Sequence, residues 1–446
     1  MDTPVCDFVR HYADANLLRL HMPGHKGQGP LGVEQLDITE IDGADSLYEA
    51  GGIIRRSEEN AAALFGCRTF YSTEGSSQCI RAMLYLARMY AVQSGRKPLI
   101  AAQRNVHKTF LSAAALLDLE VQWLYPEQEE SYLSCSLRAE QLEQVLRQSA
   151  RKPAAVYLTS PDYLGLLADV EGIARVCHDH GVLLLVDNAH GAYLKFLNRS
   201  MHPVDLGADL CCSSAHKTLP VLTGGAYLHI SQNVPAELAG QVRTALALFG
   251  STSPSYLILQ SLDAANIYLS TYPQKLNPFL QQVDAVKARL ISHGYCLYGD
   301  EPLKLTLCAK PYGYTGTELA RMLLEQGIVC EFADPDYLVL MLTPEVAAAG
   351  LQQLERVLLC IPRKPAIHLQ PPKLHRGQRV LSIREAALSP AETRPVQMCE
   401  GSILAAASVS CPPAVPILIC GERIDEAAIA AFRYYGIDCC TVVKTK

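Results

Sequence analysis

A lysine and an aspartate that each follow an apolar run have the clearest potential chemistry in this sequence. Lys217 lies in the polar run Ser213–Thr218, directly after residues 208–212, which are apolar except for one aspartate. Asp187 follows Val182–Val186, five consecutive apolar residues. A charged side chain at the end of a buried strand is costly unless it has a partner or a chemical role. Imine formation with a carbonyl cofactor is one such role for a lysine, although a solvated lysine is the better explanation of Lys217 alone.

A glycine- and serine-rich segment could hold an anion. Gly75, Ser76 and Ser77 precede the segment Gln78–Gln93, which has apolar residues at helical spacing. The free N–H groups and the dipole of a helix N-terminus favour a phosphate, and the two hydroxyls add donors. Taken alone, an ordinary capped helix start is the better explanation of this segment.

Other polar residues would complete a cofactor site. We expect Ser214 and His216 to help to hold the same phosphate, and His107 and Ala189 to cover the two faces of a ring. His190 could reach a hydroxyl group on that ring. An anion cradle, an acid for a pyridine nitrogen and an imine-forming lysine together specify pyridoxal 5'-phosphate.

The elements that must position these residues alternate between strands and helices. Strands are predicted at residues 98–102, 121–125, 154–159, 182–186, 209–213 and 225–230. The continuous apolar run before Asp187 is typical of a parallel strand that is buried on both faces. The sequence therefore predicts a doubly wound α/β domain, in which ligands bind at the carboxyl ends of the strands. Asp187, His190 and Lys217 all lie at such ends.

The remaining segments suggest several domains. We predict an N-terminal arm at 1–20, a cofactor-binding large domain with a mainly parallel sheet at 21–269, an α+β small domain at 270–360, a linker at 361–377 and a small C-terminal domain at 378–446. The arm should hold a helix at Val5–Leu18. Another helix is expected at Ser57–Phe65, with acidic residues in its first turn. In the small domain, Val329–Phe332 is expected to be a strand.

Composition narrows the class of protein. A chain of 446 residues with 49% hydrophobic and 19% charged residues is globular and should contain two or three domains. The net charge of -6 argues against nucleic-acid binding. The 16 cysteines form no C-x-x-C pair, which fits a reducing cytoplasm.

No metal or membrane segment is expected. His21 and His25 share a polar turn but have no further cluster of ligands nearby in the sequence. The N-terminus shows no signal-peptide pattern. The uncharged stretch 402–420 is interrupted by Pro412, Pro413 and Pro416, which would break a spanning helix.

These motifs resemble the bacterial ornithine/lysine/arginine decarboxylases, a family of fold-type I pyridoxal-phosphate enzymes. The resemblance rests on His21–Lys26, Arg104–Lys108, Asp187–Ala192, Ser214–Leu219, Ser251–Tyr256, Arg384–Ala386, Pro412–Pro416 and Gly421–Glu422. It covers nearly the whole chain, and it implies the short form of the family, without the N-terminal wing domain of larger relatives.

The resemblance implies roles for the residues of the site. Lys217 would form the imine with the cofactor, Asp187 would pair with the pyridine nitrogen and His107 would stack on the ring. The phosphate would be held by Ser76, Ser77, Ser214 and His216. The implied reaction is α-decarboxylation of lysine, arginine or ornithine in polyamine metabolism, with His216 or Lys217 returning a proton to Cα.

The resemblance also implies an assembly. The active site of the family lies at a dimer interface, so a homodimer or a higher homo-oligomer is expected, and Thr252 would serve the cofactor of the neighbouring subunit. Two alternatives remain open from the residues. One is another reaction on the same fold, such as amino transfer, and the other is a related protein without turnover.

The chain departs from the usual family pattern at a few positions. Glu74 stands where an asparagine is usual, which places a carboxylate near the expected phosphate. Asn188 and Tyr193 replace a glutamate and a histidine in the segment after Asp187. Asp162 stands where a threonine is common, and Cys411 where a tyrosine is usual.

Overall fold

The computed structural model describes the chain except for residues 127–131, 135, 375, 407–409, 412–414 and 445–446. The side chains of residues 410 and 411 are also outside the description, so the departure at Cys411 and the resemblance at Pro412–Ala414 fall outside the described residues. The chain forms two compact units, residues 1–94 with 183–277 and residues 95–182 with 278–446. The domain boundaries expected from the sequence stay a prediction.

The first unit contains four strands in the order β1-β7-β6-β5. They are β1 (Arg68–Ser72), β7 (Ala226–Ile230), β6 (Leu210–Ser213) and β5 (Leu183–Asp187). β5 and β6 are parallel, whereas β7 is antiparallel to both β6 and β1. Every residue of β5, β6 and β7 is buried. For β5, the continuous apolar run predicted this burial.

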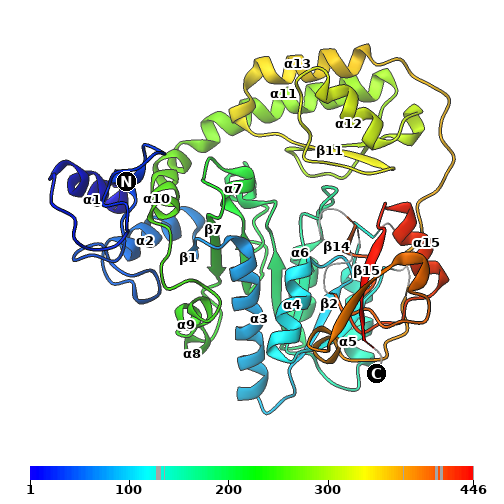
Figure 1. The fold of residues 1–446 in the computed structure, drawn as a ribbon, viewed down its shortest axis with the longest axis horizontal. Coiled ribbons are helices and arrows are strands. Elements are labelled where there is room, and N and C mark those ends of the chain that lie inside the picture. Colours follow the sequence, from blue (N-terminus) through cyan, green and yellow to red (C-terminus); the bar gives the residue numbers. More distant parts are fainter. Residues whose placement is uncertain (127–131, 135, 375, 407–409, 412–414, 445–446) are drawn as a thin grey trace. The chain divides into compact units, whose positions relative to one another are not determined.

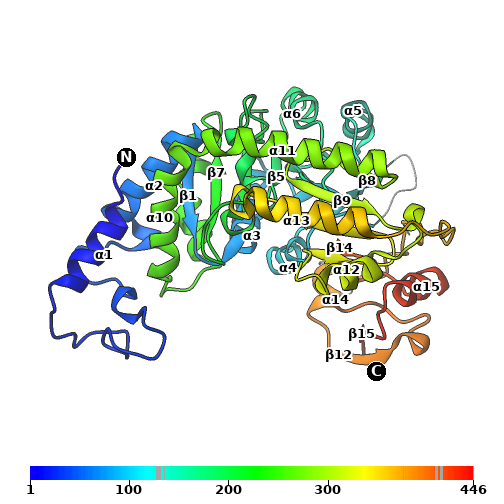
Figure 2. The ribbon, with the colours of Figure 1, turned by 90° about the horizontal axis from the view of Figure 1, so that it is seen from above.

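Helices surround these strands. They are α1 (Pro4–Asp14), α2 (Ile53–Phe65), α3 (Gly75–Gln93), α7 (Ala215–Thr218), α8 (Ala236–Ala239), α9 (Val242–Ala247) and α10 (Tyr256–Ser270), with short 3-10 turns at Glu34–Leu36, Leu47–Glu49 and Ala192–Phe196. α1, α2 and α10 lie side by side in both views (Figure 1, Figure 2). The apolar face predicted for α3 is confirmed, because Ile80, Met83, Leu84 and Ala87 are all buried.

The second unit contains three further strands in the order β4-β2-β3, with β2 parallel to both neighbours. The elements are β2 (Leu99–Gln103), α4 (Lys108–Leu117), β3 (Glu120–Leu124), α5 (Ala139–Gln148), β4 (Ala155–Thr159) and α6 (Val170–Asp179). Seven mostly parallel strands alternating with helices make this an α/β fold, as the sequence predicted.

The rest of the second unit holds two smaller assemblies. An antiparallel sheet, in the order β10-β11-β9-β8, packs against α12 (Figure 1). Its elements are α11 (Tyr272–His293), β8 (Cys296–Tyr298), β9 (Lys304–Cys308), α12 (Gly316–Leu324), β10 (Phe332–Ala333), β11 (Tyr337–Met341) and α13 (Ala347–Cys360), with short 3-10 turns at Lys310–Tyr312 and Pro344–Val346. α11 begins in the first unit and ends in this one.

The C-terminal segment packs into a core that it shares with other residues of the second unit, such as Leu164, Phe332 and Val339. Its elements are α14 (Ile383–Ala387), β12 (Ala391–Pro395), β13 (Ser410–Cys411), β14 (Val415–Pro416), α15 (Glu426–Tyr434) and β15 (Cys439–Val443), with a 3-10 turn at Val396–Met398. β12 and β15 pair in antiparallel fashion, and Leu404, Ile417, Ile424, Phe432 and Val442 are buried together. Among the described residues, no helix is long and apolar enough to cross a lipid bilayer.

The prediction for the start of α2 is wrong. The helix begins at Ile53 and not at Ser57, so the acidic residues at 58 and 59 lie in its middle and not in its first turn. The cause is a cap supplied from outside the helix. The carboxylate of Asp45 accepts hydrogen bonds from the backbone N–H groups of Gly52 and Ile54, at 2.8 and 3.0 Å.

Three other boundaries differ from the prediction by three residues or more. α1 ends at Asp14 and not at residue 18, where the leucine is 84% exposed and has nothing to pack against within the described residues. α3 begins at Gly75 and not at residue 78, because the serines form its first turn. The strand expected at 329–332 begins only at Phe332, since Val329 is 81% exposed.

Candidate active site

The carboxyl ends of β5 and β6 carry the central residues of the candidate site. Asp187 is the last residue of β5 and pairs in register with Cys212 on the parallel strand β6. The single-turn helix α7 follows β6 after one residue and carries Lys217. Because parallel strands end at the same edge of a sheet, the two charged residues are brought to that edge together.

Lys217 has a defined partner. Its Nζ atom lies 3.0 Å from Nε2 of His190, which follows β5. Lys217 is half-buried and His190 is buried. A protonated lysine can only donate, so Nε2 of His190 accepts this hydrogen bond when Lys217 carries its charge. The histidine therefore orients the lysine amine at the strand edge.

Asp187 is a buried carboxylate, with 2% of its surface exposed. Its Oδ1 atom accepts hydrogen bonds from the backbone N–H of Ala189 at 3.2 Å and from Sγ of Cys212 at 3.5 Å. Burial, together with the charge of Asp187, holds the pKa of the Cys212 thiol well above its usual range. The thiol therefore stays neutral, and a cation is the partner that such a carboxylate favours.

The start of α3 brings together two of the hydroxyls that the sequence suggested for an anion cradle, and their binding of a phosphate stays a prediction. Ser214 donates from Oγ to Oγ of Ser76 at 2.8 Å, which joins the residue before α7 to the first turn of α3. The N–H of Gly75 is already bonded to the carbonyl of Gly224, at 2.7 Å. Glu74 occupies the N-cap position of α3 but, within the described structure, gives it no side-chain cap. This end of the helix is therefore suited to an external anion.

His216 lies beside the same cradle in a fixed orientation. Its Nδ1 atom is 3.0 Å from the carbonyl oxygen of Gly225, so Nδ1 carries the proton of the neutral ring. Burial, with a further effect from the neighbouring charge of Lys217, lowers the pKa of His216. The ring is therefore neutral near pH 7 unless an anion binds next to it.

Asn188 and Ala189 follow Asp187 and are both buried. Nδ2 of Asn188 donates to Oγ of Ser213 at 3.1 Å, while its Oδ1 atom is buried and has no partner among the described residues. Asn188 therefore ties the end of β5 to the end of β6, next to Lys217 and Asp187. Sequence reasoning noted this residue only as a departure and missed that contact.

The glycine pair after α7 was also missed. Gly224 has a φ of +100°, and a Cβ atom there would lie 2.9 Å from the carbonyl oxygen of Thr73. Only glycine fits this close approach between the loop after Lys217 and the loop before α3. Two adjacent glycines shortly after the lysine were the signal in the sequence.

His107 belongs to the second unit and is described with it. It is the N-cap residue of α4, and its Nδ1 atom accepts from the backbone N–H of Thr109 at 3.2 Å. Arg104, in the same resemblance segment, is buried and donates to the carbonyls of Pro416 and Ile417 at 2.7 and 3.0 Å. Arg104 thus anchors the C-terminal segment. The stacking of His107 on a cofactor ring stays a prediction.

Thr252 lies in an exposed loop before α10. Ser255 closes this loop by accepting a hydrogen bond from the N–H of Ile258 at 3.4 Å. Among the described residues, Thr252 makes no hydrogen bond to Lys217 or Asp187. Its role toward the cofactor of a neighbouring subunit stays a prediction.

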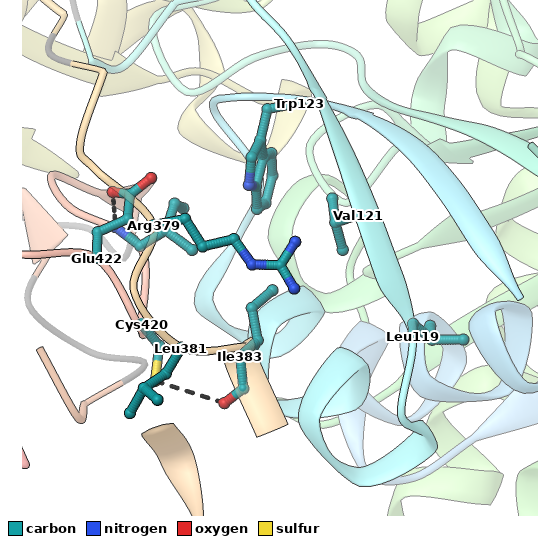
Figure 3. Close-up of a pocket in the computed structure, with 9 residues that line it drawn as sticks. Leu119, Val121, Trp123, Arg379, Leu381, Ile383, Cys420 and Glu422 are labelled. Atoms are coloured by element: carbon teal, nitrogen blue, oxygen red, sulfur yellow. Dashed lines mark hydrogen bonds between the residues drawn. The ribbon is translucent and has the colours of Figure 1, made fainter. Parts of the chain in front are cut away.

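The second unit also contains a pocket with a different character (Figure 3). Val121 and Trp123 of β3 line one side, and the guanidinium group of Arg379 points between them. The other lining residues are Leu119, Leu381, Ile383, Ile419, Cys420 and Glu422. This pocket is mainly apolar and has no lysine among its lining residues, so it lacks the chemistry of the site around Lys217.

Comparisons with known proteins give the family. Residues 3–298 match the family described as Orn/Lys/Arg decarboxylase, major domain. An arginine decarboxylase from Halalkalibacterium halodurans is 29% identical over 477 residues, which cover 97% of this chain and 93% of that protein. An arginine decarboxylase from Bacillus subtilis is 28% identical over 462 residues, which cover 96% of this chain and 92% of that protein.

A solved structure agrees in fold. The lysine decarboxylase LdcF from Francisella novicida superposes with a TM-score of 0.79 at 17% identity, covering 99% of this chain and 81% of that chain. At that identity the likeness supports the fold alone.

Proposed function

Because the chain belongs to the Orn/Lys/Arg decarboxylase family, we propose that it removes the α-carboxyl group of L-arginine with pyridoxal 5'-phosphate, giving agmatine and CO2. The observation that carries the proposal is the placement of Lys217 and Asp187 at neighbouring strand ends. Arginine is preferred over lysine and ornithine because the two arginine decarboxylases align along more than nine-tenths of this chain.

The residues of the first unit fit this cofactor. The hydroxyls of Ser76 and Ser214 and the N-terminus of α3 suit its phosphate. The buried carboxylate of Asp187 suits a protonated ring nitrogen. Pyridoxal phosphate, when bound, supplies a conjugated ring that takes up the electrons of the broken Cα–carboxylate bond.

Each side chain then has a defined task. Asp187 would hold a proton on the ring nitrogen of the cofactor, and that positive charge would in turn stabilise the buried carboxylate. Lys217 would hold the cofactor through its amine, at the carbonyl group that the α-amine of the substrate also needs. His190, 3.0 Å from Nζ, keeps that amine at the strand edge.

Lys217 is also the better candidate for returning a proton. The Cα–carboxylate bond breaks, CO2 leaves, and one proton from Nζ of Lys217 takes the vacated position on Cα. The alternative donor, His216, has its Nδ1–H directed at a carbonyl, and its pKa is lowered by burial. The Nδ1 proton of His216 is therefore held by the carbonyl oxygen of Gly225.

We propose further that the working form is a homodimer or a higher homo-oligomer. Leu18 and Leu20 in the N-terminal arm, and Met22 just after it, are 84, 81 and 70% exposed. Apolar side chains gathered on one exposed segment are typical of a surface that is covered by a partner. The exposed loop with Thr252 belongs to the same unit and is available to a neighbouring subunit.

The test compares Lys217→Ala with a control, Lys275→Ala, which removes an exposed lysine of the same unit. CO2 release is measured with arginine, lysine and ornithine side by side, together with the visible absorbance of the bound cofactor. We expect the wild type and the control to be coloured and to act fastest on arginine, and Lys217→Ala to lose both properties.

Other results would contradict the proposal. Decarboxylation retained by Lys217→Ala would exclude the role of the lysine. A new amino acid formed from an added keto acid without CO2 would favour amino transfer. A colourless wild type that takes up no pyridoxal phosphate would favour a protein without turnover.

A further inference from the structure

We propose that Glu74 weakens the binding of the cofactor's phosphate group, so that the fraction of loaded enzyme follows the free concentration of pyridoxal phosphate. This inference rests on the function proposed above. It concerns the carboxylate of the residue directly before Gly75, and the mechanism described so far makes no use of that group.

The position of Glu74 is fixed by the backbone. It directly precedes Gly75 and Ser76 at the N-cap of α3, and its own N–H donates to Oγ of Ser72 at 3.2 Å. Its side chain is exposed and forms no hydrogen bond or ion pair with any residue that the structure describes. No cation of the described chain therefore neutralises this charge.

The charge of Glu74 also acts on Tyr48, a side chain that is hydrogen-bonded to the first turn of α3. Gln78, in that turn, donates from Nε2 to the hydroxyl of Tyr48 at 2.8 Å. The pKa of Tyr48 is raised, first by burial and also by the negative charge of Glu74. The charge of Glu74 therefore reaches Tyr48, which is bonded to Gln78 in that turn.

The negative charge of Glu74 opposes the binding of a second anion at the start of α3. The N-terminus of a helix has a partial positive charge that favours one anion. Glu74 already brings a negative charge there, and a phosphate dianion that binds beside it is repelled. For partly solvated groups several ångströms apart, the repulsion corresponds to a loss of about tenfold in affinity. Salt screens part of this repulsion.

The experiment measures cofactor binding directly. The cofactor is removed from full-length wild type and Glu74→Gln, and each protein is titrated with pyridoxal 5'-phosphate and, separately, with pyridoxal, which has no phosphate. Visible absorbance reports binding. We expect Glu74→Gln to bind pyridoxal phosphate about tenfold more tightly. The affinity for pyridoxal should not change, and added salt should narrow the gap between the two proteins.

Glu237→Gln is the matched control, because it removes another exposed glutamate of the same unit. It should bind both compounds as the wild type does. Equal affinities of wild type and Glu74→Gln for pyridoxal phosphate would overturn the inference, and so would an equal gain for pyridoxal. If none of the proteins formed the coloured complex, the proposed function itself would fail, which is a distinct result.

Discussion

Asp263 is expected to hold the N-terminal helix on the first unit. The residue lies in α10 and is fully buried. Its Oδ2 atom accepts the backbone N–H groups of Val5 and Cys6, both at 2.9 Å, and Oδ1 accepts from Oγ of Ser57 at 2.5 Å. The carboxylate thus caps α1 from a distant helix and ties it to α2. Asp263→Ala would remove all three contacts.

The size of the effect follows from the donors left behind. Val5 and Cys6 are buried, so their N–H groups would lose a partner that water cannot easily replace. A buried unsatisfied donor costs about 1–3 kcal/mol. Burial raises the pKa of Asp263, which shows that the carboxylate itself is held at some cost. We therefore expect Asp263→Ala to lower the free energy of unfolding by about 3 kcal/mol.

Asp263→Asn separates the hydrogen bonds from the charge. The amide oxygen can still accept from the helix N-terminus, while the favourable interaction of a negative charge with the helix dipole is lost. That interaction is worth about 1 kcal/mol. Urea unfolding at a fixed protomer concentration measures the loss of stability in Asp263→Ala and in Asp263→Asn. Hydrogen exchange of the Val5 and Cys6 amides then shows whether the loss is located at the start of α1.

An exposed aspartate outside this hydrogen-bond network provides the control. Asp284→Ala removes an exposed carboxylate and should stay within about 0.5 kcal/mol of the wild type. If Asp263→Ala were equally mild and the exchange of the Val5 and Cys6 amides stayed slow, α1 would not depend on this cap, and the reasoning would be refuted.

Three further predictions concern the site and the fold. Asp187→Asn cannot keep the cofactor ring protonated, so CO2 release should fall by roughly a hundredfold or more while the visible absorbance remains. Gly224→Ala places a Cβ atom 2.9 Å from the carbonyl oxygen of Thr73 and should cost about 1–3 kcal/mol in urea unfolding, more than Gly95→Ala, which has open space. Burial raises the pKa of Asp162 from 3.8 to about 6. The folded protein therefore binds the proton of the Asp162 carboxyl group more tightly than the unfolded chain does. The protonated carboxyl group of Asp162 therefore stabilises the folded state at low pH, and this stabilisation is lost as the pH rises from about 4 to about 6. The free energy of unfolding of the wild type, compared with Asp162→Asn, should therefore fall by up to about 3 kcal/mol between about pH 4 and pH 6.

Local patterns predicted the parts of the fold that depend on burial. β5 was recognisable because a strand buried on both faces needs apolar residues at every position. The start of α2 was not recognisable, because its cap comes from Asp45, outside the helix. The strand expected near residue 329 failed for a related reason, since an apolar residue such as Val329 is not buried unless a neighbouring element covers it.

The candidate site divides in the same way. The sequence by itself determined the chemical groups, since Lys217, Asp187 and the serines were identifiable from their types and from the strand ends that carry them. Only the tertiary structure decided which groups meet. Ser214 reaches Ser76, and Lys217 reaches His190, through contacts between segments that are distant in the chain. Such contacts depend on the order of strands and on helix packing, which no local pattern contains.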